Sequence, residues 1–196
     1  YTQYSWDNSF NPDYPRVAGI WAAAYQEKTD QSVDGVISIT PTMVQDLLAT
    51  TGDSFTLSDG TAIDGTNATK VLQHDLYWKY FSSGSSTSES NDVCDALFAE
   101  AAEYAFDSAL ENMNASSLMK LVSTMMGGLE DRRVMIWLAD ATEQGYIEDM
   151  GYSGSMTAAS QQEPTLGVFV NFWAGSKLGW WLGMDTQVSS PVTGND

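Results

Sequence analysis

The sequence predicts a three-layer α/β domain in which a mixed β-sheet carries helices on both faces. Segments with apolar residues at helical spacing alternate with short β-branched and aromatic runs, a pattern typical of strands covered by helices. The chain has 196 residues, 43% of them hydrophobic, which is enough to bury a core without a disulfide or a metal. We therefore expect one domain at residues 1–188 and a flexible tail at 189–196.

Helix caps and β-rich runs give the order of the elements. Thr40 is an N-cap followed by Pro41 in the first helical turn, and Gly52 is a C-cap, so these residues bound a helix. Gly127 and Gly128 are expected to stop a later helix. The predicted elements are a helix from Asp13 or Tyr14 to Lys28, a strand at 33–39, a helix at 41–51, a strand at 55–57, a turn at 58–60, a helix after Thr66 or Asn67, a mobile loop at 82–91, a helix at 92–111, a helix capped by Ser116 or Ser117, a strand at 134–139, a helix at 141–150 and a β-hairpin of 166–173 and 178–182.

The charge of the chain excludes some classes of partner. Eight basic residues face 26 acidic ones, so the net charge is -18, and such a field repels nucleic acid and anionic lipid headgroups. The acidity is typical of a secreted domain that must stay soluble. No apolar run reaches the roughly 18 residues of a membrane span. Because the chain begins at Tyr1 without a signal peptide, we expect it to be cut from a longer extracytoplasmic precursor.

No motif for catalysis, a cofactor or a metal stands out. The single histidine, His74, has no G-x-S-x-G segment to pair with and is expected to be a surface or capping residue. The single cysteine, Cys94, is expected to face the core of its helix. Asp7, Asn8, Asn11 and Asp13 offer oxygen ligands for Ca²⁺, but turn capping explains the same residues. The sequence therefore predicts no catalytic residue, no cofactor and no metal.

Two surface features remain as candidate binding sites. Arg132 and Arg133 are a quarter of all basic residues; pairing with carboxylates and binding of an anion are both open interpretations. Aromatic residues also gather in or beside predicted loops, where they serve either core packing or the stacking of sugars. The candidate glycan-binding residues are Trp6, Asp7, Asn11, Asp13 and Trp78, and further aromatic residues in such places are Phe10, Tyr14, Tyr80, Trp173, Trp180 and Trp181.

Several segments together resemble the extracytoplasmic family catalogued as domain of unknown function 4012. The resemblance rests on Phe10 to Pro15, Val33 to Pro41, Leu48 to Gly52, Arg133 to Asp140, and Gly167 to Asn171 with Gly175 to Lys177. The resemblance implies a large surface protein of a Gram-positive bacterium, with an N-terminal membrane anchor and a role in cell-wall or exopolysaccharide production. The biochemical activity of that family is not established.

A second resemblance concerns the fold. The order strand, helix, Gly52, then Ile63 to Ala68 before a helix is similar to the LytR–CpsA–Psr proteins, which transfer glycopolymers from polyprenyl-pyrophosphate lipid to peptidoglycan. Those proteins hold the pyrophosphate with arginines near the segment that matches His74 to Tyr80, where this chain has Lys79 and then an acidic, Ser-rich loop. The candidate anion-binding residues are Arg16, Lys79, Arg132 and Arg133.

Three functions follow as expectations. The first is a non-catalytic cell-envelope module that binds or organises surface glycopolymer. The second is a divergent phosphotransferase that attaches lipid-linked glycopolymer to the cell wall, and the third is a structural spacer. The expected partner is a cell-surface glycopolymer or a polyprenyl-linked glycan, and the expected location is the surface of a Gram-positive bacterium.

Overall fold

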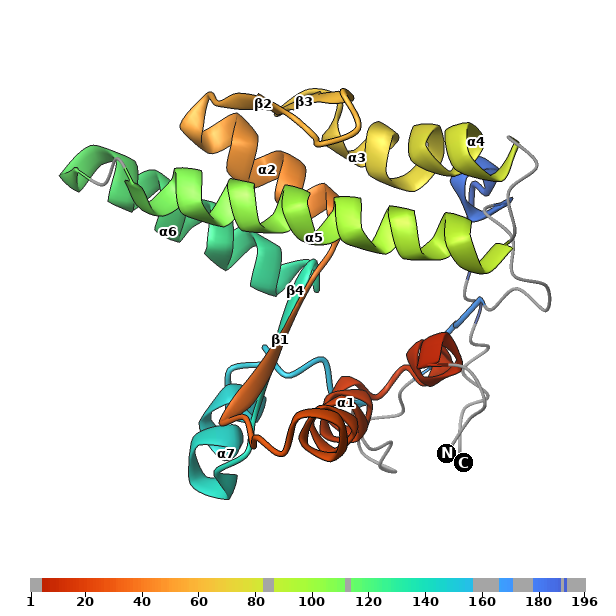
Figure 1. The fold of residues 1–196 in the computed structure, drawn as a ribbon. Coiled ribbons are helices and arrows are strands. Elements are labelled where there is room, and N and C mark those ends of the chain that lie inside the picture. The colour runs from red at the N-terminus through yellow and green to blue at the C-terminus, as the bar shows by residue number, and fades with distance from the viewer. Residues whose placement is uncertain are drawn as a thin grey trace.

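The computed structural model describes residues 5–82, 87–111, 114–156, 166–170, 178–187 and 189. Helices dominate this part of the chain and short strands join them (Figure 1). The elements are η1 (Ser5–Phe10), α1 (Tyr14–Thr29), β1 (Gly35–Ile39), α2 (Pro41–Thr51), β2 (Ser54–Thr56), β3 (Ala62–Asp64), α3 (Ala68–Lys70), the π-helix η2 (Val71–Asp75), α4 (Leu76–Phe81), α5 (Thr87–Glu111), α6 (Ala115–Glu130), β4 (Val134–Leu138), α7 (Ala141–Asp149) and η3 (Leu178–Trp181).

The strands form two separate antiparallel pairs. β1 pairs with β4, so that Gly35 lies opposite Leu138 and Ile39 opposite Val134, and β2 pairs with β3. The α/β class is confirmed, but among the described residues the single mixed sheet is wrong. The reason is that the long segment between β1 and β4 folds into helices that pack mainly on one another rather than on a sheet.

The larger hydrophobic core surrounds α2. Its apolar residues Met43, Leu47 and Leu48 are fully buried because α5 and α6 both pack against this helix. Thr40 accepts a hydrogen bond from the backbone N–H of Met43, and Gly52 takes the left-handed conformation with φ of 79°, so both predicted caps are confirmed. In Figure 1, α2, α5 and α6 form one helical layer, with the β2–β3 hairpin and α3 beside it.

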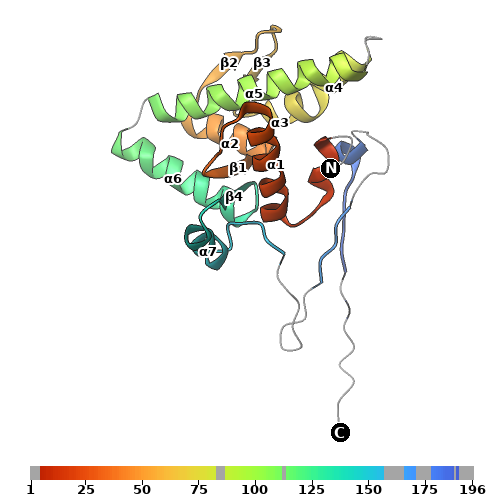
Figure 2. The ribbon, with the colours of Figure 1, turned by 60° about the horizontal axis from the view of Figure 1, so that its bottom comes forward.

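A smaller cluster lies at the other end of the β1–β4 pair. Tyr14 and Val17 of α1 pack against Val36, Met135 and Trp137, which point to one face of these strands. In Figures 1 and 2, α1 and α7 lie on opposite sides of the two strands. The β1–β4 pair therefore links the helical layer to a small and separate apolar cluster.

Two glycines, Gly65 and Gly128, allow close packing. At Gly128 the structure also differs from the prediction. α6 continues through Gly127 and Gly128 to Glu130, so these glycines do not end it. A Cβ atom on Gly128 would lie 2.7 Å from the sulfur of Met43, which shows that this glycine lets α6 approach α2. A Cβ on Gly65 would lie 2.4 Å from the Cα of Ala49, so this position also has no room for a side chain.

The start of α5 also differs from the prediction. α5 begins at Thr87, so residues 87–91 are helical instead of part of a mobile loop, whereas residues 83–86 lie outside the described part. Ser90 explains the early start, because its side chain is buried and its hydroxyl donates to the backbone carbonyl of Tyr80 at 3.1 Å. A serine that the sequence presents as loop composition thus anchors the first turn of a helix.

The predicted C-terminal hairpin is not present in the described residues. Residues 166–170 form no strand, and Leu178–Trp181 is a 3-10 helix. Residues 171–177, which include the predicted turn, lie outside the described part. The rings of Trp180 and Trp181 pack against His74.

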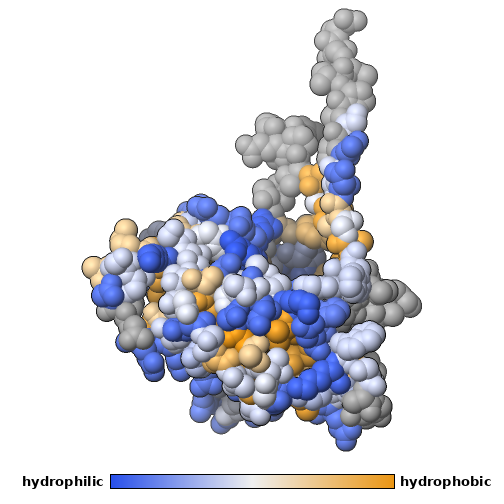
Figure 3. All heavy atoms as spheres, turned by 90° about the horizontal axis from the view of Figure 1, so that it is seen from above, coloured by the Kyte–Doolittle hydropathy of each residue, from blue (hydrophilic) through white to orange (hydrophobic). Residues whose placement is uncertain are grey.

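The surface combines many acidic residues, from which the net charge of -18 arises, with exposed apolar side chains. Figure 3 shows the face seen from above, where hydrophilic residues surround a central area of hydrophobic ones and further hydrophobic residues lie elsewhere on the face. Within the described residues, no helix has both the length and the apolar character needed to cross a membrane.

Cys94 is fully buried, as predicted for a core-facing helix residue.

Candidate functional site

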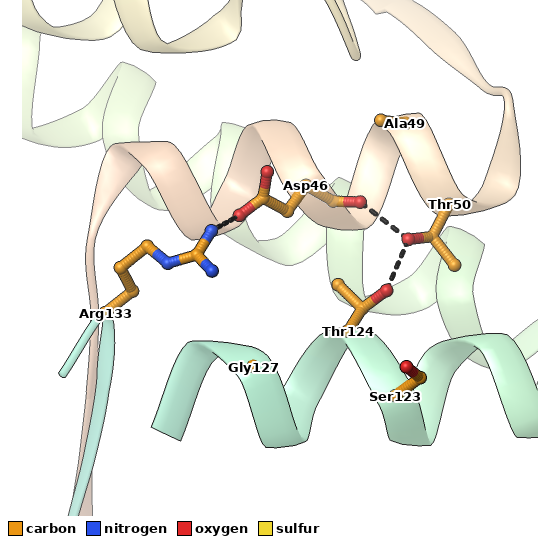
Figure 4. A pocket seen from close by; sticks show the side chains of 7 residues that line it. All are labelled: Asp46, Ala49, Thr50, Ser123, Thr124, Gly127 and Arg133. Carbon is orange, nitrogen blue, oxygen red and sulfur yellow. Dashed lines mark hydrogen bonds and ion pairs between the residues drawn. The ribbon is translucent and has the colours of Figure 1, made fainter. Parts of the chain in front are cut away.

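A polar groove runs between α2 and α6 (Figure 4). It has a volume of about 350 Å³ and small side chains line most of it. Because α2 and α6 cross with small residues on their facing sides, the helices leave a hollow that larger side chains would fill. The lining residues are Asp46, Ala49 and Thr50 from α2, Ser123, Thr124 and Gly127 from α6, and Arg133 before β4.

Arg133 closes one end of this groove. Its guanidinium forms ion pairs with Asp46 and, at 2.8 Å, with Asp131. Its backbone N–H donates to the carbonyl of Gly128 and its own carbonyl accepts from Thr40, so the residue is fixed at the junction of α6 and β4. The Nε–H of Arg133 is buried and has no hydrogen-bond partner among the described residues. An unpaired buried donor of this kind costs roughly 1–3 kcal/mol.

Two hydroxyl groups bridge the middle of the groove. The hydroxyl of Thr50 donates to the backbone carbonyl of Asp46 at 2.8 Å, so its single proton is used. The hydroxyl of Thr124 must therefore be the donor across the 2.7 Å contact with Thr50. Figure 4 shows these bonds as a chain that joins α2 to α6. The groove thus contains two hydrogen-bonded threonine hydroxyls and the Arg133–Asp46 ion pair, and its lining has no histidine or cysteine.

A second candidate site is an aromatic surface, which we define by His74, Trp78, Trp180 and Trp181. The His74 ring lies 5.5 Å from the ring centre of Trp180 and 5.7 Å from that of Trp181. Trp78 follows His74 by four residues along the continuous helix of η2 and α4, so both side chains lie on the same side of it. Trp78 and Trp181 remain 73% and 74% exposed, although indole rings are costly to leave in water.

Polar groups hold the aromatic surface in place. His74 Nδ1 lies 2.7 Å from a carboxylate oxygen of Asp75, which also accepts hydrogen bonds from Lys70 at 2.6 Å. Burial raises the pKa of the Asp75 carboxyl, but the hydrogen bonds from Lys70 and His74 outweigh burial and bring this pKa below its usual value. The carboxylate therefore stays charged at neutral pH and fixes the orientation of the His74 ring.

A second polar cluster holds the neighbouring turn. The Asp59 carboxylate accepts hydrogen bonds from Lys79 at 2.8 Å, from the hydroxyl of Tyr80 at 2.7 Å and from the backbone of Thr61 at 2.9 Å. Burial raises the pKa of the Asp59 carboxyl, but these hydrogen bonds together lower it well below its usual range. The cluster ties the turn between β2 and β3 to α4, and it engages Lys79 with a carboxylate.

The structure distributes the four candidate anion-binding residues over separate elements. Arg16 is exposed on α1, and Arg132 is exposed with a φ of 57° in the turn after α6. Lys79 is paired with Asp59, and Arg133 is paired with two carboxylates. Figure 1 shows α4 at one end of the helical layer and the turn between α6 and β4 near its middle. Lys79 and the two arginines of that turn therefore do not form one cationic cluster.

The candidate glycan-binding residues also lie in different parts of the fold. Trp78 belongs to the aromatic surface, whereas Asn11 and Asp13 lie at the start of α1. There the side chain of Asn11 accepts from the N–H of Asp13 at 3.0 Å, which is a turn-capping bond, whereas Asp13 accepts from the N–H of the distant Met156. The side chains of Trp6 and Asp7 lie outside what the structure describes.

Sequence reasoning missed parts of both sites. The four-residue spacing of His74 and Trp78 is a local signal that could have placed them together, whereas the contact of His74 with Trp180 spans more than a hundred residues. The groove had a weaker signal, namely the small residues at Ser123 and Gly127 on a helix that is otherwise rich in Leu and Met. Such a spacing indicates close helix contact but not a particular partner helix.

Comparison with protein families gives a match over the first part of the chain. Residues 1–77 match the model of a family described as "Protein of unknown function (DUF4012)". The matched region includes α1, β1, α2, the β2–β3 hairpin and His74, but not α5, α6, Arg133 or the three tryptophans of the aromatic surface. No curated protein and no solved structure matches the chain.

Proposed function

We propose that this domain is a non-catalytic module of the cell envelope that binds a surface glycopolymer on the aromatic surface. The observation that carries this proposal is the exposure of two indole rings, Trp78 one helical turn after His74 and Trp181 in contact with the His74 ring. A folded domain with a buried core of its own gains nothing by leaving such rings in water. Exposed rings held in fixed positions are typical of surfaces that bind a partner.

The chemistry of the aromatic surface suits sugar rings. The apolar face of a sugar ring can stack on an indole, while its hydroxyls need donors and acceptors at the edge of the platform. His74, Asp75 and Lys70 supply such groups next to the tryptophans. Because Asp75 is charged and Lys70 is already paired with it, the surface offers little excess positive charge. We therefore propose a neutral or hydroxyl-rich glycan as the ligand.

Basic side chains that are already paired with carboxylates support glycan binding rather than group transfer. A transferase that acts on a lipid-linked pyrophosphate needs several free cations around the leaving group. Lys79 and Arg133 are each held by carboxylates, and the Thr50 and Thr124 hydroxyls in the groove beside Arg133 are already engaged in hydrogen bonds. The LytR–CpsA–Psr-like transfer reaction is therefore the weaker of the two proposals for this domain.

The proposed location is the cell surface of a Gram-positive bacterium. The match of residues 1–77 to a family of unknown function supports a relationship to that family, whose resemblance suggested this location. The net charge of -18 supports a glycan partner over nucleic acid or an anionic lipid surface, since both would be repelled. Membrane anchoring belongs to the proposed full-length protein and not to the residues described here.

A glycan-binding titration tests the proposal. The chain is titrated with soluble fragments of wall polysaccharide and exopolysaccharide, and binding is followed by tryptophan fluorescence and calorimetry. We expect Trp78→Ala and Trp181→Ala each to weaken binding about tenfold, because an aromatic anchor at the centre of a site commonly contributes more than 1 kcal/mol. Trp21→Ala, which removes an exposed tryptophan of α1, is the matched control and should bind like the parent chain.

The same titration separates the alternatives. Binding of polyprenyl pyrophosphate that depends on Arg133 would replace our proposal with the transferase. Absence of binding to every glycan and to the lipid would leave the structural spacer as the remaining account. Equal losses for all three tryptophan variants would show that the effect is a general loss of folding rather than loss of a site.

A further inference from the structure

His74 presents one of its two ring nitrogens to solvent. The nitrogen Nδ1 lies 2.7 Å from a carboxylate oxygen of Asp75. Within the described part of the chain, the other nitrogen, Nε2, has no hydrogen-bond partner. The buried side-chain atoms that lack a partner in this part are Thr69 Oγ1 and Arg133 Nε, so Nε2 is not buried and solvent reaches it. A ligand on the aromatic surface can therefore contact this nitrogen.

The Asp75 carboxylate determines which nitrogen of His74 carries the proton. Burial raises the pKa of Asp75, but hydrogen bonds from Lys70 and His74 bring it below its usual value, so this carboxylate is ionised at neutral pH. An ionised carboxylate has no proton to donate, and the hydrogen in the 2.7 Å contact therefore belongs to Nδ1. Because a neutral imidazole carries only one such hydrogen, Nε2 is a hydrogen-bond acceptor.

The other polar groups of the aromatic surface are donors or are already engaged. The three indole rings of this surface can only donate hydrogen bonds. Lys70 donates to both carboxylate oxygens of Asp75 at 2.6 Å, and one of these oxygens also accepts from His74. A sugar hydroxyl on this surface thus finds donors for its oxygen but needs an acceptor for its own proton. Nε2 of His74 supplies that acceptor.

The position of Nε2 is fixed from two sides. Asp75 holds the Nδ1 side of the ring, and the ring centres of Trp180 and Trp181 lie 5.5 Å and 5.7 Å from that of His74. The plane of Trp181 makes an angle of 84° with the imidazole plane, and the plane of Trp180 makes an angle of 40°. An acceptor that is already held in place loses little conformational entropy when a ligand binds.

We propose that Nε2 of His74 accepts a hydrogen bond from a hydroxyl of the bound glycan, and that Asp75 is the positioning residue that keeps this nitrogen unprotonated. This role of Nε2 depends on the proposed glycan binding and names the atom that selects the ligand. The ligand must carry a free hydroxyl at the edge of the sugar ring that stacks on an indole. A sugar with a methyl ether at that place leaves Nε2 without a partner and binds more weakly.

Nitrogen-15 NMR of the full chain tests the protonation of the ring without any ligand. Two-bond couplings between ring hydrogens and ring nitrogens distinguish a protonated nitrogen from a bare one, and His74 is the single histidine of the chain. We expect a protonated Nδ1 and a bare Nε2 in the neutral ring. Asp75→Asn should shift Nε2 towards its protonated signal, because an amide can either accept from Nδ1 or donate to it. Asp95→Asn, exposed on α5, is the control and should change neither signal.

Binding measurements test the contact with the ligand. The chain is titrated with soluble wall-polysaccharide fragments and with the same fragments after complete O-methylation, which keeps the sugar rings and removes every O–H donor. The parent chain should bind the methylated fragments about tenfold more weakly than the native ones. His74→Phe keeps an aromatic ring and removes both nitrogens, so it should bind the native fragments about tenfold more weakly and discriminate less between the two forms.

A second pair of variants does not depend on the aromatic ring. His74→Gln can place its amide oxygen where Nε2 lies, whereas the shorter side chain of His74→Asn reaches only the place of Nδ1. Both variants lose the ring contacts with the tryptophans, so the difference between them reports the acceptor alone. We expect His74→Gln to bind the native fragments more tightly than His74→Asn.

The outcomes separate the role of Nε2 from glycan binding itself. A bare Nδ1 and a protonated Nε2 in the parent chain would overturn the acceptor role. Glycan binding that is equal in the parent chain and His74→Phe, or equal in His74→Gln and His74→Asn, overturns the contact while the aromatic surface remains a glycan site. A parent chain that binds no native fragment overturns both proposals, whichever nitrogen carries the proton.

Discussion

The helical layer (α2, α5 and α6) and the α1 cluster (Tyr14, Val17 and Ala18) bury very different amounts of apolar surface. In the helical layer, Leu47 and Leu48 of α2 are completely buried between other helices. In the α1 cluster, Tyr14 and Val17 are 7% exposed, and the same helix leaves Trp21 and Tyr25 40% and 46% exposed. The comparison shows that one part of the molecule can form a stable core, while α1 depends on a few contacts with the β1–β4 pair. Variants that separate the two parts test this difference.

The largest expected difference is between Leu47→Ala and Val17→Ala. Leu47→Ala leaves a cavity in the centre of the helical layer and should lower the free energy of unfolding by about 3 kcal/mol. Val17→Ala removes less volume from a site that can relax, and it should cost about 1 kcal/mol. Urea unfolding measured by circular dichroism gives both values. Equal losses would show that the two clusters are packed equally well.

A second comparison uses Tyr14, which anchors the α1 cluster. Its hydroxyl donates to the carbonyl of Val36 at 3.1 Å, and burial raises the pKa of Tyr14 from 10.0 to about 12. Because the folded pKa lies above the unfolded one, the contribution of Tyr14 is complete below pH 10. It is lost as pH rises to 12, with a loss of about 2 kcal/mol. Tyr14→Phe should therefore reduce the alkaline loss of stability.

Two further tyrosines control this experiment. Burial also raises the pKa of Tyr77 in the helical layer to about 12, so part of the alkaline loss should persist in Tyr14→Phe. Tyr25→Phe, on the exposed side of α1, should not change the pH dependence. If Tyr14→Phe and the parent chain lose stability in parallel between pH 10 and 12, Tyr14 does not anchor the cluster.

The smallest expected effect concerns the polar contacts of Asp59 at the surface of the helical layer. Asp59→Asn weakens its hydrogen bonds to Lys79, Tyr80 and Thr61 and should cost about 1 kcal/mol at pH 7. Hydrogen bonding lowers the pKa of Asp59, so its contribution is present above the usual carboxyl pKa near 4. It is lost as pH falls below that value. Asp59→Asn should flatten this acid dependence, and Asp95→Asn, exposed on α5, should not.

Local sequence signals predicted most elements well. Features that depend on contacts between residues far apart in the sequence could not be predicted. Thr40 and Gly52 could be identified because a cap depends on its nearest neighbours along the chain. Gly128 was misinterpreted because its role is to let α6 approach Met43, which is far away in sequence. The pairing of β1 with β4 could not be predicted for the same reason, since nothing in either strand specifies its partner.

The candidate site shows the same limit. Pairing with a carboxylate was one of two open interpretations of Arg133, and Arg133 is so paired, but only the fold shows that one partner is Asp46 on α2. Trp78 was identified as a candidate from its aromatic character. Its neighbours His74, Trp180 and Trp181 become a common surface only when the C-terminal segment returns to α4. Residue type therefore predicted chemistry, whereas tertiary contacts determined which residues share a site.

The pairing of β1 with β4 has a consequence for the order of folding. The two strands enclose residues 40–133, and the N–H of Thr40 donates to the carbonyl of Arg133 at 2.9 Å where this segment begins and ends. Closing so long a loop is entropically costly unless the enclosed helices have already collapsed and brought their ends together. We therefore expect the helices between the strands to form first, the strands to pair next, and α1 to dock last. Stopped-flow refolding should show Val17→Ala accelerating unfolding with little effect on the folding rate.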